Sequence, residues 1–137
     1  MERPINRDVL TLRQKAEKAT PADLPVARDL MDTLRANFDR CVGMAANMIG
    51  VNKRIIVIAL GGMVVPMLNP RIVKKSKETY DTEEGCLSLS GVRPVTRHQS
   101  ITVRYEDMNF KVHTQEFSGF TAQIIQHEID HCEGILI

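Results

Sequence analysis

The residues His127 and His131, four positions apart, constrain the fold of this chain more than any other feature. Four residues of α-helix make about one turn, so a helix through this segment places both imidazoles on one face. Glu128 then projects beside a metal ion held by the two rings. Without Glu128 the pair would be typical of a solvated helix. With it, the pattern indicates a hydrolytic metal centre, where the glutamate takes a proton from water and passes it to a leaving amine.

A catalytic centre of this kind needs a third protein ligand and leaves one position open for water. The chemically suitable residues are Asp130, carboxylates further upstream, and the cysteines Cys41, Cys86 and Cys132. Cys132 lies about 100° further round the helix than His131, which predicts a packing role. Gly85 would let the backbone beside Cys86 approach a ligand closely, although most free cysteines are simply buried apolar residues. The residues alone leave the choice open.

Length and composition predict one domain that spans residues 1–137, long enough to bury a core. The formal net charge is +1, from 18 basic and 17 acidic residues, so no electrostatic signal for nucleic acid is present. The one basic cluster, residues 71–77, is interpreted as a solvated strand end. There is no long apolar segment and no secretory leader, and the number of cysteines is odd. We therefore expect a cytoplasmic protein with neither membrane contact nor disulfides.

Helical spacing of apolar residues predicts a scaffold helix in the first third of the chain. Residues 20–23 read Thr-Pro-Ala-Asp, which is typical of a helix start because threonine caps, proline suits the first turn and aspartate complements the helix dipole. Leu24, Leu30 and Phe38 lie on one apolar face, which continues to about Arg40.

The rest of the chain reads mainly as strands. Residues 54–60 predict a buried strand, and residues 63–69 predict its hairpin partner, interrupted by Pro66. Residues 99–105 and 110–117 predict two further strands, and the final helix follows them. The order helix, strands, helix indicates an α+β fold, with a mostly antiparallel sheet packed around the metal-binding helix.

Three segments, in this order, resemble the sequence motifs of the peptide deformylases. Residues 84–88 read Glu-Gly-Cys-Leu-Ser and residues 126–131 read Gln-His-Glu-Ile-Asp-His, and both match family motifs completely. The first family motif, a Gly-rich segment that ends in Ala-Ala-x-Gln, corresponds to residues 41–48. Its centre is kept, but Cys41 replaces the first glycine and Met48 replaces the glutamine. The resemblance covers nearly the whole chain.

This resemblance implies a role for each matching residue. Cys86, His127 and His131 would bind one divalent metal ion, Glu128 would be the general acid and base, and the backbone N–H of Leu87 would face the developing oxyanion. The metal in this family is usually Fe²⁺, and Zn²⁺, Ni²⁺ or Co²⁺ can occupy the same site. A set of one thiolate and two imidazoles suits all four ions.

The resemblance also implies a substrate. The enzyme would remove the N-terminal formyl group from formyl-methionyl peptides of nascent proteins and release formate. An extended peptide would lie in a groove beside the metal, flanked by Gly43, Ile49 and Arg93. A contact of residues 71–77 with the ribosome, near the nascent-chain exit, is a second interpretation of the basic cluster.

Two departures from the family pattern bear on activity. Met48 has no N–H to offer the substrate carbonyl oxygen, and losing one oxyanion donor typically lowers the rate about 100- to 1,000-fold. Asn47 would compensate only if its amide turned inward, although adjacent side chains normally point in different directions. The chain also stops soon after the metal helix, where family members often continue with another helix.

These departures define an alternative function, that of a weak or inactive family member that binds metal and peptide N-termini. A metalloprotease that cuts internal peptide bonds is a third interpretation. The intact Glu128 argues against the inactive family member, and Cys86 in its motif argues against the metalloprotease.

Overall fold

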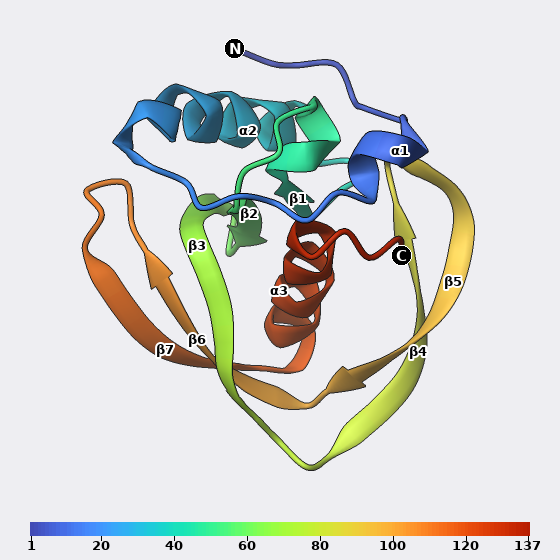
Figure 1. The fold of residues 1–137 in the computed structure, drawn as a ribbon. Helices are drawn as coiled ribbons and strands as arrows, with labels where there is room; N and C mark the ends of the chain where they lie inside the picture. The colour runs from blue at the N-terminus through green and yellow to red at the C-terminus, as the bar shows by residue number, and fades with distance from the viewer.

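The computed structural model describes residues 1–137 as a long helix set between two antiparallel sheets (Figure 1). The helical elements are α1 (Val9–Leu12), the 3-10 turn η1 (Pro21–Asp23), α2 (Leu24–Ala36), the 3-10 turn η2 (Ala46–Ile49) and α3 (Gly119–Cys132). The strands are β1 (Gly43–Ala45), β2 (Ile55–Leu60), β3 (Met63–Lys75), β4 (Thr79–Cys86), β5 (Leu89–His98), β6 (Ser100–Glu106) and β7 (Val112–Ser118).

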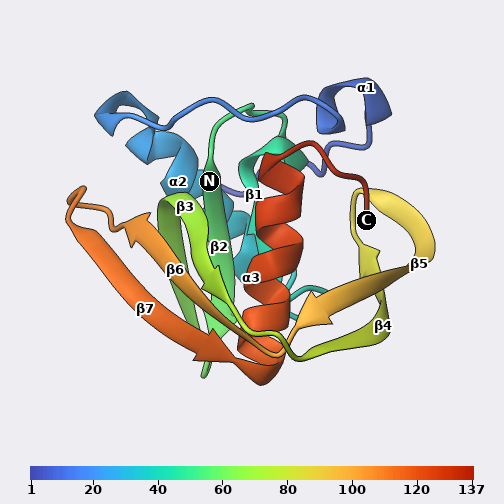
Figure 2. The same cartoon turned by 60° about the horizontal axis from the view of Figure 1, so that its bottom comes forward.

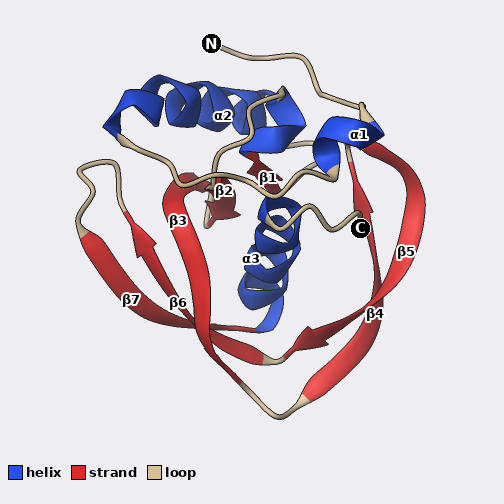
Figure 3. Cartoon of the chain, viewed as in Figure 1, coloured by secondary structure: helices blue, strands red, loops and turns tan.

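The larger sheet has five strands in the order β1-β2-β3-β6-β7, and β4 and β5 form a sheet of their own. Every neighbouring pair of strands is antiparallel. In both views of the ribbon, the larger sheet lies on one side of α3 and the β4–β5 sheet on the other (Figures 1 and 2). The prediction of an α+β fold with a mostly antiparallel sheet around the metal-binding helix is therefore confirmed (Figure 3).

Strand β2 is apolar at successive positions because it is covered on both faces. Ile56 and Ile58 belong to the core between the larger sheet and α3, which also contains Ile125 and Ile129 of the helix. Ile55 and Val57 point to the opposite face, where they join a second core with α2. That core includes the buried helical residues Ala27, Leu30 and Leu34. Alternate side chains of a strand point to opposite faces, so a strand between two helices has no polar face.

Helix α3 is buried around most of its circumference, with nine of its fourteen residues buried. A helix enclosed in this way needs apolar residues on nearly all sides, and any polar residue it buries needs a partner. His127, Glu128 and His131 are among the buried residues. Their burial sets the chemistry of the site described below.

The predicted scaffold helix forms, but it ends earlier than expected. Asp23 Oδ2 accepts a hydrogen bond from the Thr20 N–H at 2.8 Å, and the chain passes through η1 into α2. The helix ends at Ala36, not near Arg40, and the Phe38 side chain is exposed. The placement of Phe38 on the buried face was therefore wrong, because the helix stops before reaching it.

The four predicted strands all form, but the strand predicted at residues 63–69 is longer than expected and three further strands were missed. Strand β3 continues to Lys75 and includes Pro66, and its exposed end agrees with the interpretation of residues 71–77. The β4–β5 hairpin was not predicted as a pair of strands, and Arg93 lies within β5. None of the helices combines the length and apolarity needed to cross a membrane.

Candidate active site

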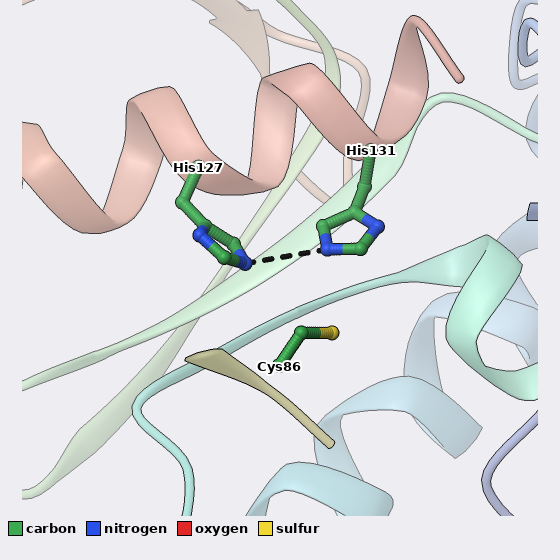
Figure 4. A group of neighbouring side chains, drawn as sticks. All are labelled: Cys86, His127 and His131. Carbon is green, nitrogen blue, oxygen red and sulfur yellow. Dashed lines mark hydrogen bonds between the residues drawn. The ribbon is translucent and has the colours of Figure 1, made fainter. Parts of the chain in front are cut away.

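His127 and His131 present their rings from one face of α3, as the four-residue spacing predicts. Their Nε2 atoms lie 3.3 Å apart, and the ring centroids are separated by 5.0 Å. Both side chains are buried. Figure 4 shows the two rings directed from the helix toward the Cys86 side chain.

Cys86 reaches the histidines from the other sheet. It is the last residue of β4, where the pairing with β5 shifts register between Gly85 and Cys86. An irregularity of this kind redirects a side chain out of the regular ladder. One ligand atom from each of Cys86, His127 and His131 lies within 4.8 Å of the others.

The donor set fits a divalent metal ion. Two neutral imidazoles and one thiolate are ligands for Zn²⁺, Fe²⁺, Co²⁺ and Ni²⁺, and three protein ligands leave a position for water. Burial, together with the positive charge of His127, lowers the pKa of His131 to about 3, so its ring is neutral. Burial lowers the pKa of His127, but the neighbouring Glu128, Cys86 and Glu84 outweigh it and raise this pKa to about 10. The surroundings therefore favour a positive charge between the rings, which a proton or a metal cation can supply.

Glu84 fixes the orientation of His127. Its Oε1 accepts a hydrogen bond from His127 Nδ1 at 2.7 Å, which leaves Nε2 directed at the other ligands. Burial raises the pKa of Glu84, but the hydrogen bonds from His127 and Arg97 outweigh it and lower this pKa to about 2. The carboxylate is therefore charged, and when the His127 ring is neutral, as a metal ligand must be, it keeps the ring proton on Nδ1.

Glu84 is held in turn by two further side chains, Arg97 and Gln123. Arg97 donates to both carboxylate oxygens, with Nη2 at 2.6 Å from Oε1 and Nε at 3.0 Å from Oε2, and its Nη1 lies 2.6 Å from Asp130 Oδ2. Gln123 Nε2 donates to Glu84 Oε2 at 2.9 Å. These bonds link β4, β5 and α3 around the histidine pair. The two parallel bonds between the Arg97 guanidinium and the Glu84 carboxylate are among the stronger hydrogen-bonded arrangements in proteins.

Glu128 lies in the same cleft with an unpaired oxygen. The residue is buried, and its Oε1 has no hydrogen-bond partner. Burial raises the pKa of its carboxyl to about 7. A carboxyl group with a pKa near neutrality both accepts and releases protons readily, as general acid–base catalysis requires.

Gly43 leaves room for this glutamate. A Cβ atom at Gly43 would lie 2.7 Å from Ile124 Cγ2 and 3.0 Å from Glu128 Oε2. The glycine is therefore needed for close approach between β1 and α3, not for an unusual backbone angle.

Two of the candidate ligands, Cys86 and His127, line a cleft of about 490 Å³. The residues that line it include Cys41, Gly43, Met48, Cys86, Leu87, His127 and Glu128. All three motifs identified in the sequence therefore contribute to one cavity.

The model of the family described as polypeptide deformylase matches residues 4–137. The chain belongs to this family. A peptide deformylase from Clostridium beijerinckii is 58% identical over 137 residues, and the alignment covers 100% of both chains. A peptide deformylase from Dictyoglomus thermophilum is 37% identical, over 92% of this chain and 83% of the relative. Enzymes of this family remove N-formyl groups, so the prediction of a hydrolase is confirmed and the inactive alternative is not favoured.

Solved deformylase structures share the fold. The crystal structure of the Thermotoga maritima peptide deformylase matches with a TM-score of 0.90 and 28% identity, over 99% of this chain and 95% of the other. A class I type b peptide deformylase from Acinetobacter baumannii, bound to Met-Ala-Ser, matches with a TM-score of 0.89 and 29% identity, over 99% and 97% of the two chains.

The residue that replaces the deformylase glutamine forms part of the cleft wall. The Met48 side chain is buried, and its Sδ accepts from the Ala45 N–H at 3.5 Å and lies 4.0 Å from Cys86 Sγ. Asn47 does not replace the missing amide, because its Nδ2 donates to the His131 carbonyl at 3.0 Å and its side chain is not part of the cleft lining.

Other residues singled out in the sequence lie outside the cleft. Arg93 Nη1 is 3.5 Å from the Ser90 carbonyl oxygen, and the residue does not line the cavity. Ile49 is buried in the core that contains α2. Cys132 is buried, as its packing role predicts, whereas Cys41 lines the cleft and its Sγ lies 2.8 Å from the Gly43 carbonyl oxygen.

The sequence did not predict the residues that orient His127, either directly or through Glu84. Glu84 belongs to the motif at residues 84–88 and Asp130 to the motif at residues 126–131, so their positions were available as a signal. Arg97 had no such signal, because an arginine in a polar strand is usually solvated. Only the three-dimensional arrangement shows that it is buried between two carboxylates.

Proposed function

We propose that Cys86, His127 and His131 hold one divalent metal ion, and that Glu128 moves the proton while the chain hydrolyses the formyl group of formyl-methionyl peptides. The observation that carries this proposal is the convergence of three ligand atoms within 4.8 Å of one another, beside the cleft that Cys86, His127 and Glu128 line. The family assignment supports the same reaction.

For the ion we propose Fe²⁺, with Zn²⁺, Ni²⁺ and Co²⁺ as alternatives for the same ligands. A thiolate with two imidazoles binds all of these borderline ions. When bound, the ion polarises the formyl oxygen and lowers the pKa of water. The thiolate of Cys86 adds negative charge beside the ion, and we expect the ferrous form to be sensitive to oxidation.

The protein groups carry the proton and hold the substrate. Glu128 takes a proton from water, and the oxygen of that water bonds to the formyl carbon. The C–N bond then breaks, Glu128 gives its proton to the departing amine nitrogen, and formate leaves. The backbone N–H of Leu87 is assigned to the developing oxyanion, and Glu84 keeps His127 oriented throughout.

We propose that Met48 lowers the rate of deformylation relative to a site with glutamine at this position. The thioether has no N–H, so the oxyanion has one donor fewer. The presence of Glu128 and of all three ligands supports a slow enzyme over a protein that only binds, because binding alone does not need the glutamate.

The substrate would lie in the cleft as an extended peptide. The Met-Ala-Ser complex of the Acinetobacter enzyme supports peptides that begin with methionine. Gly43 and Met48 line the cleft where the first residue would bind. Arg93 is retained only as a candidate for contact with later residues, since it lies outside the lining.

For the wider context, we propose that residues 1–137 act as one catalytic domain in the cytoplasm. Nascent chains that carry formyl-methionine are made there. We also retain the ribosome, near the nascent-chain exit, as a candidate partner of the exposed basic residues at the end of β3.

The test is formate release from formyl-Met-Ala-Ser by protein purified without oxygen and loaded with Fe²⁺. We expect turnover by the wild type, none by Glu128→Ala, and an increase for Met48→Gln of about 100-fold or less. Met48→Leu is the matched control, because it keeps the volume and adds no donor. Absence of formate from a wild-type chain that holds its metal would contradict the enzymatic function.

A further inference from the structure

Asn47 connects the first motif to the end of the metal-binding helix. It belongs to η2, directly before Met48, and its side chain is only 5% exposed. Its Nδ2 donates to the His131 carbonyl at 3.0 Å and lies 3.5 Å from the Leu12 carbonyl oxygen. The side chain of Asn47 therefore contacts the backbone of a candidate ligand, 84 positions away in the chain.

This contact lies at the C-terminal end of α3, where a helix is least well held by its own hydrogen bonds. The last four carbonyls of a helix have no partner within the helix, and helix ends open more easily than helix centres. α3 ends at Cys132, one residue after His131. The His131 carbonyl receives only one backbone hydrogen bond from beyond the helix, from the Gly134 N–H at 3.1 Å. Asn47 supplies a second bond, from a separate part of the fold.

The N-terminal segment fixes Asn47 in turn. Asn6 Nδ2 donates to the Asn47 carbonyl at 3.0 Å, and the Asn6 N–H donates to the Met48 carbonyl at 2.7 Å. The Ala16 N–H donates to the Cys132 carbonyl at 2.7 Å. Residues 6–16 thus contact both η2 and the end of α3, so that Asn47 is held between two segments.

Asn47 and His131 also each contain one unpaired polar atom. Asn47 Oδ1 and His131 Nδ1 are both buried without a hydrogen-bond partner. A histidine that binds metal through Nε2 carries its proton on Nδ1, and that N–H normally has an acceptor. Both residues that this contact joins therefore keep hydrogen-bonding capacity that the folded chain does not use.

We propose that Asn47 is a positioning residue for His131, and that it sets how long the site retains its metal. The inference rests on the proposed role of His131 as a ligand, and it goes beyond that role by assigning a function to Asn47. Asn47 fixes the backbone at the end of α3, so that the His131 ring stays where the other two ligands meet. Loss of the Asn47 side chain frees this end of the helix and speeds metal release.

The chain contains a matched control for this idea. Asn37 is also 5% exposed, and its Nδ2 donates to the carbonyl of Thr33, near the end of α2, at 2.7 Å. Asn37→Ala and Asn47→Ala therefore both remove a buried amide that donates to a carbonyl near a helix end, but only Asn47 contacts α3. Asn37 Oδ1 also accepts from Arg40 Nη2 at 2.7 Å, so the loss of stability of each variant is measured.

The experiment measures Zn²⁺ release from the full chain, as the rate of transfer to a colorimetric chelator. We expect Asn47→Ala to release Zn²⁺ about 10- to 100-fold faster than the wild type. We expect Asn37→Ala to release it at nearly the wild-type rate. Thermal unfolding of the metal-free proteins checks that both variants lose a similar amount of stability.

Equal release rates from the two variants, at equal loss of stability, would mean that Asn47 is merely structural, and the proposal would be wrong. If Asn47→Ala does not fold, Asn47→Ser makes a smaller change, and release at the wild-type rate would overturn the proposal equally. Zn²⁺ release does not need turnover, so a chain that binds Zn²⁺ but releases no formate contradicts the proposed function alone. A wild-type chain that binds no Zn²⁺ would overturn both.

Discussion

His127 Nδ1 lies 2.7 Å from Glu84 Oε1, although 43 positions separate the two residues in the chain. The contact joins α3 to β4, and Arg97 and Gln123 keep the carboxylate in place. A candidate metal ligand is thus oriented by a residue from the sheet that also supplies Cys86. The motif at residues 84–88 therefore contributes both a candidate ligand and the group that orients another candidate ligand.

Replacement of Glu84 by glutamine should weaken metal binding. Glu84→Gln keeps the size of the side chain but removes the charge that holds His127 in one tautomer, and loss of such a partner typically lowers metal affinity about 10- to 100-fold. Competition for Zn²⁺ with a chelator of known affinity measures the effect. Asp81→Asn is the control, since Asp81 is an exposed residue of the same strand that hydrogen-bonds Thr96. Equal affinities for the two variants would contradict the assigned role of Glu84.

Addition of a methyl group at Gly43 should damage the site. In Gly43→Ala the new Cβ would overlap Ile124 and crowd Glu128, so we expect a loss of about 1–3 kcal/mol in the free energy of unfolding. Displacement of Glu128 should also lower kcat/KM by about 100-fold. Urea unfolding and formate release measure the two effects.

A matched glycine shows whether the backbone or the space matters. A Cβ at Gly85 would meet its nearest atom, the Gly91 carbonyl oxygen, at 3.4 Å, and neither Gly43 nor Gly85 has a positive φ. We expect Gly85→Ala to change stability by no more than about 0.5 kcal/mol. A similar loss in both variants would rule out the steric explanation.

The Cys41 thiol should resist alkylation. Burial raises the pKa of Cys41 to about 12, and the negative charge of Glu128 acts in the same direction. The thiolate is the reactive form, so labelling by iodoacetamide at about pH 8 should be slow in the folded protein and fast in urea. Between about pH 9 and pH 11 the folded rate should rise roughly tenfold per pH unit, where an ordinary thiol has already levelled off. Mass spectrometry of the labelled peptide gives the rate, and a plateau near pH 9 would contradict the prediction.

Truncation in the α2 core should be costly, whereas truncation on the surface should not. Leu30 is fully buried, and Leu10 is 77% exposed. Leu30→Ala should lower the free energy of unfolding by about 2–5 kcal/mol, because it removes buried surface and leaves a cavity. Leu10→Ala should lower it by no more than about 0.5 kcal/mol. Urea unfolding of both variants tests whether the α2 core contributes to stability as its burial indicates.

The clustering of the three candidate ligands could be predicted from the sequence because the pattern is local. His127 and His131 are one helical turn apart, and Cys86 lies in a five-residue motif. Contacts that arise only from folding could not be predicted. Arg97 lies in a strand rich in polar residues, and nothing in its neighbourhood along the chain indicates that it is buried. The role of Asn47 was considered only as an inward-facing amide, and the structure places the side chain against the end of α3 instead.

The same distinction explains the fold. β2 could be predicted because two helices cover it, which requires an unbroken apolar run. The β4–β5 hairpin was missed because one of its faces is solvated and carries charged and small residues that resemble a loop. The end of α2 was placed too late because Phe38 continues the apolar spacing after the helical hydrogen bonds have stopped.

The candidate ligands come from two parts of the fold. Cys86 is the last residue of β4 in the smaller sheet, whereas His127 and His131 lie on α3, which packs against the larger sheet. An ion held by all three would join these two halves as a cross-link does. A ligand that binds only the folded state stabilises it in proportion to its concentration and affinity. The β4–β5 sheet should therefore exchange its amide hydrogens faster in metal-free protein, while the larger sheet stays protected. In that case the ion would hold the smaller sheet against the rest of the fold as well as take part in the reaction.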